Sequence, residues 1–293
     1  LFINIESYGE LKRINELAIA KNKKVPCCIR LNPNISAKTH EYIATGLKTS
    51  KFGISESEIK DISENIGQFD GVSLKGLSCH IGSHITDPSL SLQALKILME
   101  CATSLQELNI EIEYLNIGGG LAIQYKDEPE VSIKDVIKLL TEEVGPNYKL
   151  IVEPGRSIVG NSGALISQVE LIKETENLSF ALIDAGMNDL IRPALYDAWH
   201  NISEVEYGNI EPREYSIVGP VCESADIFGD DRSLGIEEGS ILAIQDTGAY
   251  GFTMSSNYNS RTKSAEVLVN GSESRIIRHR ETFEEMVKLE TKE

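Results

Sequence analysis

The residues best suited to chemistry stand where strands in the first half of the chain are predicted to end. His80 opens the turn HIGS, which ends at Ser83, three glycines occupy Gly118–Gly120, and Glu153 opens the turn EPGR, which ends at Arg156. Ligands of parallel α/β proteins bind at the carboxyl ends of strands. Backbone N–H groups of a glycine turn can close around a phosphate, and an arginine fork suits a carboxylate. A glutamate in such a place can hold a protonated ring nitrogen. The three turns therefore predict a site for an anionic heterocycle.

Each of these motifs also has a purely structural interpretation. A triple glycine can be no more than a tight turn, a single histidine is more often a core or surface residue, and Glu153 can form an internal ion pair with Arg156. The glycines do not make a dinucleotide fingerprint, because no G-x-G-x-x-G pattern and no suitably spaced acidic residue follow them.

Three loops of the second half add further reactive groups. The loop NDLIRPALY contains Arg192 and Tyr196, the turn GPVCES places the thiol of Cys222 beside the carboxylate of Glu223, and Tyr250 stands between glycines in GAYG. A cysteine flanked by Gly-Pro and Glu is unlike the usual buried thiol. Each loop alone could be structural, but together the motifs supply phosphate donors, carboxylates, an imidazole, a thiol and arginines.

The elements that carry the first three motifs alternate between strands and helices. Strand-like runs begin at residues 1, 25, 74, 113 and 150, and each is followed by a helix or a turn. Helix starts are marked by Ser7 with Glu10, Ser55 with Glu58, the pair Asp87-Pro88, and Ser132. This alternation predicts a parallel sheet, either doubly wound or closed into a (β/α) barrel.

The pattern changes after about residue 156. Apolar runs at 165–172, 180–183, 215–218, 241–244, 265–269 and 275–278 are separated by Gly, Asn, Asp and Ser turns, and a short helix is expected only after Thr282. These features predict a C-terminal β domain, either a barrel or a sandwich. We therefore expect two domains, 1–156 and 157–293.

Composition excludes several classes of function. The 293 residues include 28 Lys plus Arg and 45 Asp plus Glu, a net charge of −17, which argues against nucleic acid and anionic membrane surfaces as partners. No apolar run approaches the roughly 20 residues of a membrane-spanning helix. The five cysteines are odd in number and lack both a CxxC pair and metal-ligand spacing. They indicate a reducing cytoplasm and predict no metal site.

Taken in order, the motifs resemble one enzyme family. HIGS, GGG, EPGR, MNDLIRPALY, GPVCES and DTGAYG are similar to the diaminopimelate decarboxylase family of fold-type III pyridoxal-phosphate decarboxylases. SKFGI at residues 50–54 and the ending from Asn257-Tyr258-Asn259 through Val267-Leu268-Val269 fit the same family. The resemblance extends from Leu1 to about Leu289. It implies an alanine-racemase-like (β/α)8 TIM barrel followed by a C-terminal β-barrel or sandwich domain. It also implies pyridoxal 5′-phosphate as cofactor and conversion of meso-diaminopimelate to L-lysine and CO₂, the last step of lysine biosynthesis.

The resemblance implies a role for each cofactor-binding residue. His80 would stack on the pyridine ring, Gly118–Gly120 with Tyr250 would hold the phosphate, and Glu153 would bind the ring nitrogen. The remaining residues assigned to the cofactor or its immediate surroundings are Ser83, Pro154, Gly155 and Arg156.

The resemblance also assigns the substrate contacts and a proton donor. Arg156, Arg192 and Tyr196 would bind the carboxylates of the substrate, with Tyr250 nearby, and Glu223 would bind its distal ammonium. Cys222 would return a proton to the substrate carbon after CO₂ leaves. In this family Cys222 and Glu223 reach the site from the partner subunit, so the resemblance implies a homodimer with shared active sites.

One departure from the family is expected to matter. The family's cofactor-binding lysine lies on the first barrel strand in a Tyr-Ala-x-Lys-like run, and no such run exists here. Lys51 belongs to the SKFGI stretch, which matches a different family segment. By family order Leu1 begins the fourth barrel strand. We therefore expect a fragment with the last five strands, unstable alone and without normal catalysis.

Three alternatives remain open from the sequence. The same fold could decarboxylate ornithine, arginine or carboxynorspermidine, although Arg192, Tyr196 and Glu223 favour a substrate whose far end carries both an amine and a carboxylate. The chain could be a non-catalytic homologue that binds partners, although every motif keeps its reactive side chain. It could also be a soluble α/β plus β protein with accidental motifs.

Overall fold

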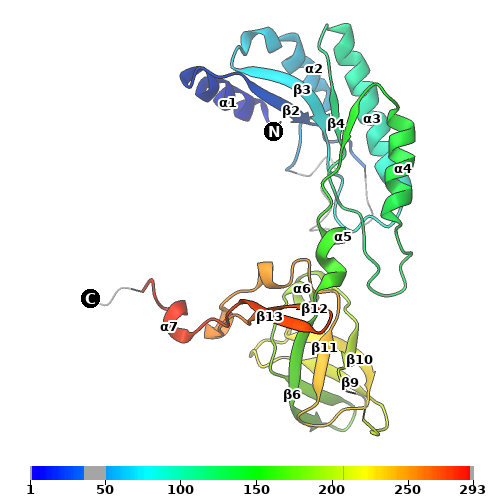
Figure 1. Ribbon diagram of the computed structural model, residues 1–293, viewed down its shortest axis with the longest axis vertical. Coiled ribbons are helices and arrows are strands. Elements are labelled where there is room, and N and C mark those ends of the chain that lie inside the picture. Colours follow the sequence, from blue (N-terminus) through cyan, green and yellow to red (C-terminus); the bar gives the residue numbers. More distant parts are fainter. Residues whose placement is uncertain (1, 36–50, 207, 291–293) are drawn as a thin grey trace. The chain divides into compact units, whose positions relative to one another are not determined.

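The computed structural model describes residues 2–35, 51–206 and 208–290. The chain divides into two compact units (Figure 1). The first comprises Leu1–Gln124 and Glu128–Ser157, and the second comprises Tyr125–Asp127 and Ile158–Glu293. Ser50 of the SKFGI stretch lies outside the described residues, as does Leu1.

The first unit is built on a five-stranded sheet in which neighbouring strands are parallel. The spatial order β1-β2-β3-β4-β5 follows the chain. The strands are β1 (Ile3–Ile5), β2 (Val25–Arg30), β3 (Val72–Ser78), β4 (Tyr114–Asn116) and β5 (Lys149–Ile151). The predicted parallel sheet is therefore present, and its strands begin within two residues of the expected positions.

Helices follow the strands where the capping signals predicted them. The main helices are α1 (Tyr8–Ala20), α2 (Glu56–Glu64), α3 (Pro88–Glu107) and α4 (Ile133–Val144), and the short segments are η2 (Ile66–Gln68), α5 (Arg156–Val159) and η3 (Gly160–Ser162). Ser7, Ser55, Asp87 and Ser132 are the N-caps of the four main helices. Each cap side chain accepts a hydrogen bond from a backbone N–H of the first turn, which otherwise lacks a partner.

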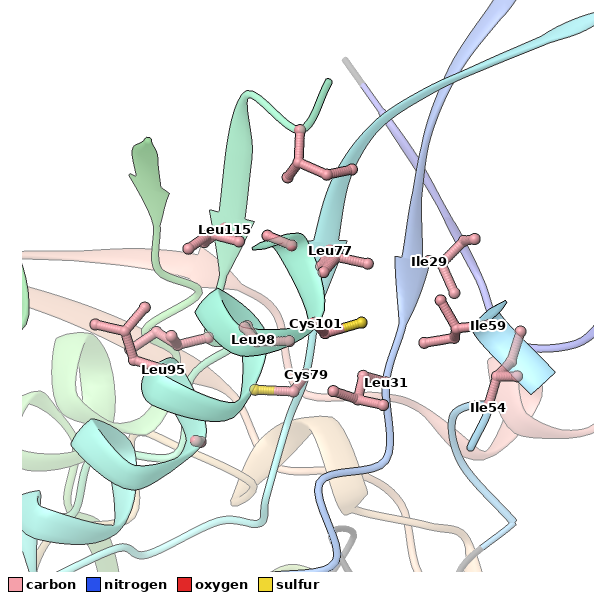
Figure 2. Close-up of a cluster of buried hydrophobic side chains, with 14 of the residues drawn as sticks. Ile29, Leu31, Ile54, Ile59, Leu77, Cys79, Leu95, Leu98, Cys101 and Leu115 are labelled. Atoms are coloured by element: carbon pink, nitrogen blue, oxygen red, sulfur yellow. The ribbon is translucent and has the colours of Figure 1, made fainter. Parts of the chain in front are cut away.

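The four main helices share one apolar core with the sheet. Figure 2 shows Leu95, Leu98 and Cys101 of α3 beside Leu77 of β3 and Leu115 of β4, all of them buried. The same core includes buried residues of α1, α2 and α4. A doubly wound sheet would bury both of its faces under helices, so the doubly wound alternative does not describe this unit.

The second unit contains a six-stranded sheet of order β10-β9-β7-β6-β11-β8. Its strands are β6 (Leu165–Glu174), β7 (Ser179–Ile183), β8 (Ile202–Glu204), β9 (Arg213–Val218), β10 (Ile227–Leu234) and β11 (Ile241–Ile244). The edge strands β8 and β10 contact each other, so the sheet curls into a nearly closed, barrel-like form around Tyr215, Ile217, Phe228 and Leu242.

Short elements complete this unit. The hairpin β12 (Glu266–Asn270) and β13 (Glu273–Arg278) forms a separate two-stranded sheet. The remaining helical pieces are α6 (Arg192–Tyr196), η4 (Phe252–Met254), η5 (Tyr258–Ser260) and α7 (Phe283–Met286). Over the described parts of both units, no helix is long and apolar enough to cross a membrane.

Candidate functional site

Polar side chains gather on the face of the parallel sheet that the helices leave uncovered. Side chains alternate between the faces of a strand, so Leu77 and Leu115 enter the core while Ser78 and Asn116, one residue later, point to the other face. A cavity of about 190 Å³ lies there. It is lined by Asn4, Glu6, Arg30, Ser78, Cys79, His80, Asn116, Gly119 and Glu153.

The glycine turn after β4 is packed too tightly for any larger residue. A Cβ added to Gly119 would lie 2.0 Å from the carbonyl oxygen of Glu153. Gly118 and Gly120 have φ of +71° and +96°, a region that L side chains rarely adopt. The three glycines are therefore required here by space and by backbone conformation, and the turn can bring its backbone close to a ligand.

Side chains hold this turn from two sides. The N–H of Gly118 donates to Asn116 Oδ1 (2.9 Å), and the N–H of Gly119 donates to His80 Nδ1 (3.2 Å). The N–H of Glu153 donates to the carbonyl oxygen of Gly118 (2.7 Å). The ends of β3, β4 and β5 are thus joined into one hydrogen-bonded assembly at the edge of the cavity.

His80 is a neutral imidazole at neutral pH. Burial, and secondarily the positive charge of Arg30, lower the pKa of His80 below its usual 6.5. Because Nδ1 accepts from Gly119, the ring proton is assigned to Nε2. A neutral, partly buried ring beside a cavity can stack on a flat heterocycle.

The carboxylate of Glu153 is oriented by an amide. Asn116 Nδ2 donates to Glu153 Oε1 (2.7 Å). On the far side of the cavity Arg30 pairs with Glu6 at 2.5 Å and donates to the carbonyl oxygen of His80 at 3.5 Å. The cavity therefore offers both an acceptor carboxylate and a partly buried guanidinium that is paired with Glu6.

The structure brings some of the predicted residues of this unit together and not others. His80, the glycine turn and Glu153 converge on the cavity. Ser83, Pro154, Gly155 and Arg156 belong to the same unit but do not line the cavity. Arg156 is buried at the start of α5. The turn that holds Ser83 adjoins the glycines, because a Cβ on Gly120 would lie 2.1 Å from the carbonyl oxygen of Gly82.

In the second unit Arg192 is buried within a defined network. Its guanidinium carbon lies 4.7 Å from the centre of the Tyr125 ring, and its Nη1 lies 2.8 Å from Nε2 of the fully buried His200. His200 Nδ1 lies 2.8 Å from the carbonyl oxygen of Gln245. Because a carbonyl only accepts, Nδ1 carries the proton and Nε2 accepts from Arg192, so His200 is neutral.

The Cys222–Glu223 turn contacts the short helix η5. Tyr258 Oη donates to Glu223 Oε2 (2.5 Å), and Asn259 Nδ2 lies 3.6 Å from Cys222 Sγ. Hydrogen bonding to Glu223 raises the pKa of Tyr258. Cys222 is exposed, whereas the other four cysteines are buried.

Tyr196 and Tyr250 are the other predicted residues of this unit. Tyr196 is partly buried at the end of α6. Tyr250 is 41% exposed and has φ of +61°, which is uncommon for a bulky residue and marks a constrained site.

Several residues of these networks were not assigned to a site from the sequence. Asn116 and Arg30 line the cavity, and His200, Tyr258 and Asn259 contact predicted site residues of the second unit. Strand alternation was the available signal for the first two, since each follows a core residue by one position. For His200 no local pattern exists, because its partner Arg192 belongs to a different motif. Tyr258 and Asn259 lie in the stretch 257–259 that resembles the family, but their contacts join segments 35 and 37 residues apart, so their roles could not be assigned from it.

The residues around the cavity fit pyridoxal 5′-phosphate on structural grounds. The glycine turn lets a ligand come close to its backbone where no Cβ can stand, His80 offers a neutral ring, and Glu153 offers an oriented carboxylate. These suit a phosphate, a flat ring and a protonated ring nitrogen respectively. Residues 2–160 match the family model described as the pyridoxal binding domain of pyridoxal-dependent decarboxylases. The fold and the cavity thus place this protein in the class of fold-type III pyridoxal-phosphate decarboxylases.

Comparison with individual relatives identifies the family within this class. The chain is 44% identical to the diaminopimelate decarboxylase of Pseudomonas aeruginosa, over 97% of this chain and 68% of the relative. Helicobacter pylori diaminopimelate decarboxylase complexed with L-lysine superposes with a TM-score of 0.92 at 40% identity, covering 99% of this chain and 73% of that one. The M. jannaschii enzyme in co-complex with L-lysine gives 0.93 at 38% identity, covering 100% and 69%. The chain belongs to the diaminopimelate decarboxylase family.

Proposed function

We propose that this protein decarboxylates meso-diaminopimelate to L-lysine and CO₂ with pyridoxal 5′-phosphate as cofactor. The observation that carries the proposal is the joined assembly of His80, the glycine turn and Glu153 at one cavity. Its support is the 44% identity to a diaminopimelate decarboxylase and the presence of L-lysine in complexes of two relatives.

Within the first unit the cofactor would be held by backbone and side-chain groups acting on its different parts. Gly118–Gly120 would bind the phosphate, His80 would stack on the ring, and Glu153 would accept the hydrogen of the ring nitrogen. When bound, the cofactor supplies an electron sink for the pair of electrons left on the substrate carbon when its bond to the carboxylate breaks. By keeping the ring nitrogen protonated, Glu153 would preserve that sink.

The residues that do not line the cavity are assigned roles from the family resemblance. Ser83, Pro154 and Gly155 would complete the surroundings of the cofactor, and Arg156 would bind cofactor or substrate. Tyr250 would contact the phosphate and the substrate. Measuring cofactor binding and substrate binding on single variants separates a role toward the cofactor from a role toward the substrate.

Substrate recognition would rest on the second unit. Arg192 and Tyr196 would bind substrate carboxylate, and the fixed guanidinium of Arg192 supports that role, because a preformed fork costs less to order than a mobile one. Glu223 would bind the distal ammonium. Cys222 would donate a proton to the substrate carbon after CO₂ departs, and its exposure leaves it accessible to a ligand.

The remaining proposals concern architecture and setting. We propose that the five-stranded sheet forms part of a (β/α)8 barrel, with 1–156 as its domain and 157–293 as the β domain with the substrate loops. Helices on a single face of the sheet support this. We further propose a homodimer in which Cys222 and Glu223 serve the partner's site, and a cytoplasmic location, which the five free cysteines support.

The proposal is tested on the protein as its source cell makes it. CO₂ release is measured with meso-diaminopimelate, ornithine, arginine and carboxynorspermidine, and the protein is then reduced with borohydride and mapped for a pyridoxyl-lysine peptide. We expect CO₂ and L-lysine from diaminopimelate alone, together with one labelled lysine. Preference for another substrate would replace the assignment of substrate, and no turnover with no label would overturn the function.

A further inference from the structure

Asn116 lies at the centre of the hydrogen bonds that shape the cavity. It is the last residue of β4, is 5% exposed, and stands between Ser78 of β3 and Ile151 of β5 in the sheet register. Its backbone carbonyl accepts from the N–H of Cys79 (2.8 Å). The main chain of Asn116 is therefore fixed by both neighbouring strands before its side chain makes any contact.

The two ends of the Asn116 amide are distinguishable by their partners. A backbone N–H can only donate, so the group facing Gly118 is the oxygen Oδ1 (2.9 Å). The group 2.7 Å from Glu153 Oε1 is consequently the NH₂, which donates. The same side chain thus holds the first glycine of the turn and one oxygen of the carboxylate.

We infer that Asn116 is a positioning residue that fixes Glu153 relative to the glycine turn, so that ring nitrogen and phosphate of the cofactor are bound at a set separation. This inference rests on the proposed function. Aspartate has nearly the same shape but cannot do this, because its second oxygen would face Glu153 Oε1 at about hydrogen-bonding distance. Two carboxylates that close resist joint ionisation.

Asn116→Asp therefore isolates the contact to Glu153. It keeps the acceptor for the N–H of Gly118 and replaces the donor to Glu153 by a charged oxygen. Asn15→Asp is the matched control, because Asn15 Oδ1 accepts from the N–H of Gly71 (2.8 Å) in the same unit. It adds the same charge beside a glycine N–H, away from the cavity. Thermal unfolding of both variants identifies any general loss of fold.

Pyridoxine 5′-phosphate is the probe, because it carries the ring nitrogen and the phosphate but has no aldehyde for a lysine. Its dissociation constant is measured by calorimetry, and its near-ultraviolet absorption band reports protonation of the ring nitrogen. We expect Asn116→Asp to weaken binding roughly ten-fold or more and to shift the band. Asn15→Asp should bind as the wild type does.

A paired substitution tests the contact itself. In the double variant Asn116→Asp with Glu153→Gln, the amide of the introduced glutamine can donate to the introduced aspartate and direct its own oxygen to the ring nitrogen. In Glu153→Gln alone, the NH₂ of Asn116 draws the glutamine oxygen away from the ring. The double variant is therefore expected to bind the probe more tightly than Glu153→Gln.

The outcomes separate the inference from the function on which it rests. Wild-type protein that does not bind pyridoxine 5′-phosphate would overturn the proposed function and the inference together. Wild-type binding with unchanged binding by Asn116→Asp would overturn the inference alone. A double variant that binds no better than Glu153→Gln would also refute it, because a residue with only a structural role would add a second loss.

Discussion

Replacing Gly119 by alanine should disable the site through a single steric conflict. The new Cβ would lie 2.0 Å from the carbonyl oxygen of Glu153, and ordinary van der Waals contact begins at 3.4 Å. One of the two groups must therefore move by the difference, 3.4 − 2.0 = 1.4 Å. Unlike Gly118 and Gly120, Gly119 has no positive φ that would strain the backbone of an alanine, so the effect is one of space alone.

A displacement of this size should be costly for catalysis. A misplacement of about 1 Å in a catalytic group can cost about 100-fold in rate, so kcat/KM for CO₂ release from meso-diaminopimelate should fall at least about 100-fold. Pyridoxine 5′-phosphate binding should weaken in parallel, because Glu153 and the turn move relative to each other.

The matched control is Gly67→Ala, in the same unit. A Cβ on Gly67 meets no atom within 4 Å, so this variant should retain wild-type activity and binding. If Gly119→Ala keeps both within about two-fold of wild type, the close approach of the turn to Glu153 is wrong. If Gly67→Ala loses as much activity and binding as Gly119→Ala, the steric argument also fails, because a methyl group without a close neighbour would then be as harmful as one that meets Glu153.

Four other predictions concern residues outside the turn. His200→Leu should lower the free energy of unfolding in urea by about 1–3 kcal/mol and raise KM, because Arg192 loses a buried acceptor. His200→Gln keeps an acceptor and should recover most of the stability and of the KM. If it recovers neither, His200 does not act as the acceptor for Arg192. Leu98→Ala should cost about 3 kcal/mol in urea unfolding, since Leu98 is fully buried; a loss below about 1 kcal/mol would contradict the packing. Iodoacetamide should label only Cys222 in the folded protein, because it alone is exposed and burial raises the pKa of the other four cysteines to about 11 or 12; peptide mapping that finds another labelled cysteine would contradict this. Because the pKa of His80 is lowered in the folded state, the unfolded state binds more protons below pH 6.5. Acidification should therefore destabilise wild type more than His80→Gln. If both proteins lose the same free energy of unfolding on acidification, the pKa of His80 is not lowered by folding.

Local signals were sufficient for the first unit and insufficient for the second. Ser7, Ser55, Asp87 and Ser132 begin helices as predicted, because an N-cap satisfies orphan N–H groups within its own turn. Strand β10 was missed because Gly229 and its acidic neighbours interrupt the apolar pattern at two register shifts.

Strand pairing in the second unit depends on contacts that no local pattern records. Strand β8 is only three residues long. The parallel pairing of β7 with β9 joins segments separated by β8 in the chain. The order of this sheet follows from packing around Tyr215 and Leu242, which is a property of the folded state.

The candidate site shows the same division between local and distant information. The motifs revealed His80, the glycine turn and Glu153, because each has a distinctive neighbour in sequence. Asn116 was not noticed, because it lies inside the predicted strand 113–117 and belongs to none of the motifs. Its importance follows from register, which places it between β3 and β5.

The two faces of the parallel sheet indicate why these polar residues are there. A buried polar group costs free energy unless it is hydrogen-bonded, and even then an apolar side chain of similar shape is often as stable. The helix-covered face follows that rule, with Leu77 and Leu115 in a continuous apolar core. The opposite face instead carries Arg30, Asn116 and Glu153, each hydrogen-bonded in a specific orientation. For Asn116, the buried one of the three, stability gives no reason for that choice, whereas positioning a group that binds a charged, flat ligand does. Strand alternation therefore separates the residues that maintain the fold from those that serve the ligand.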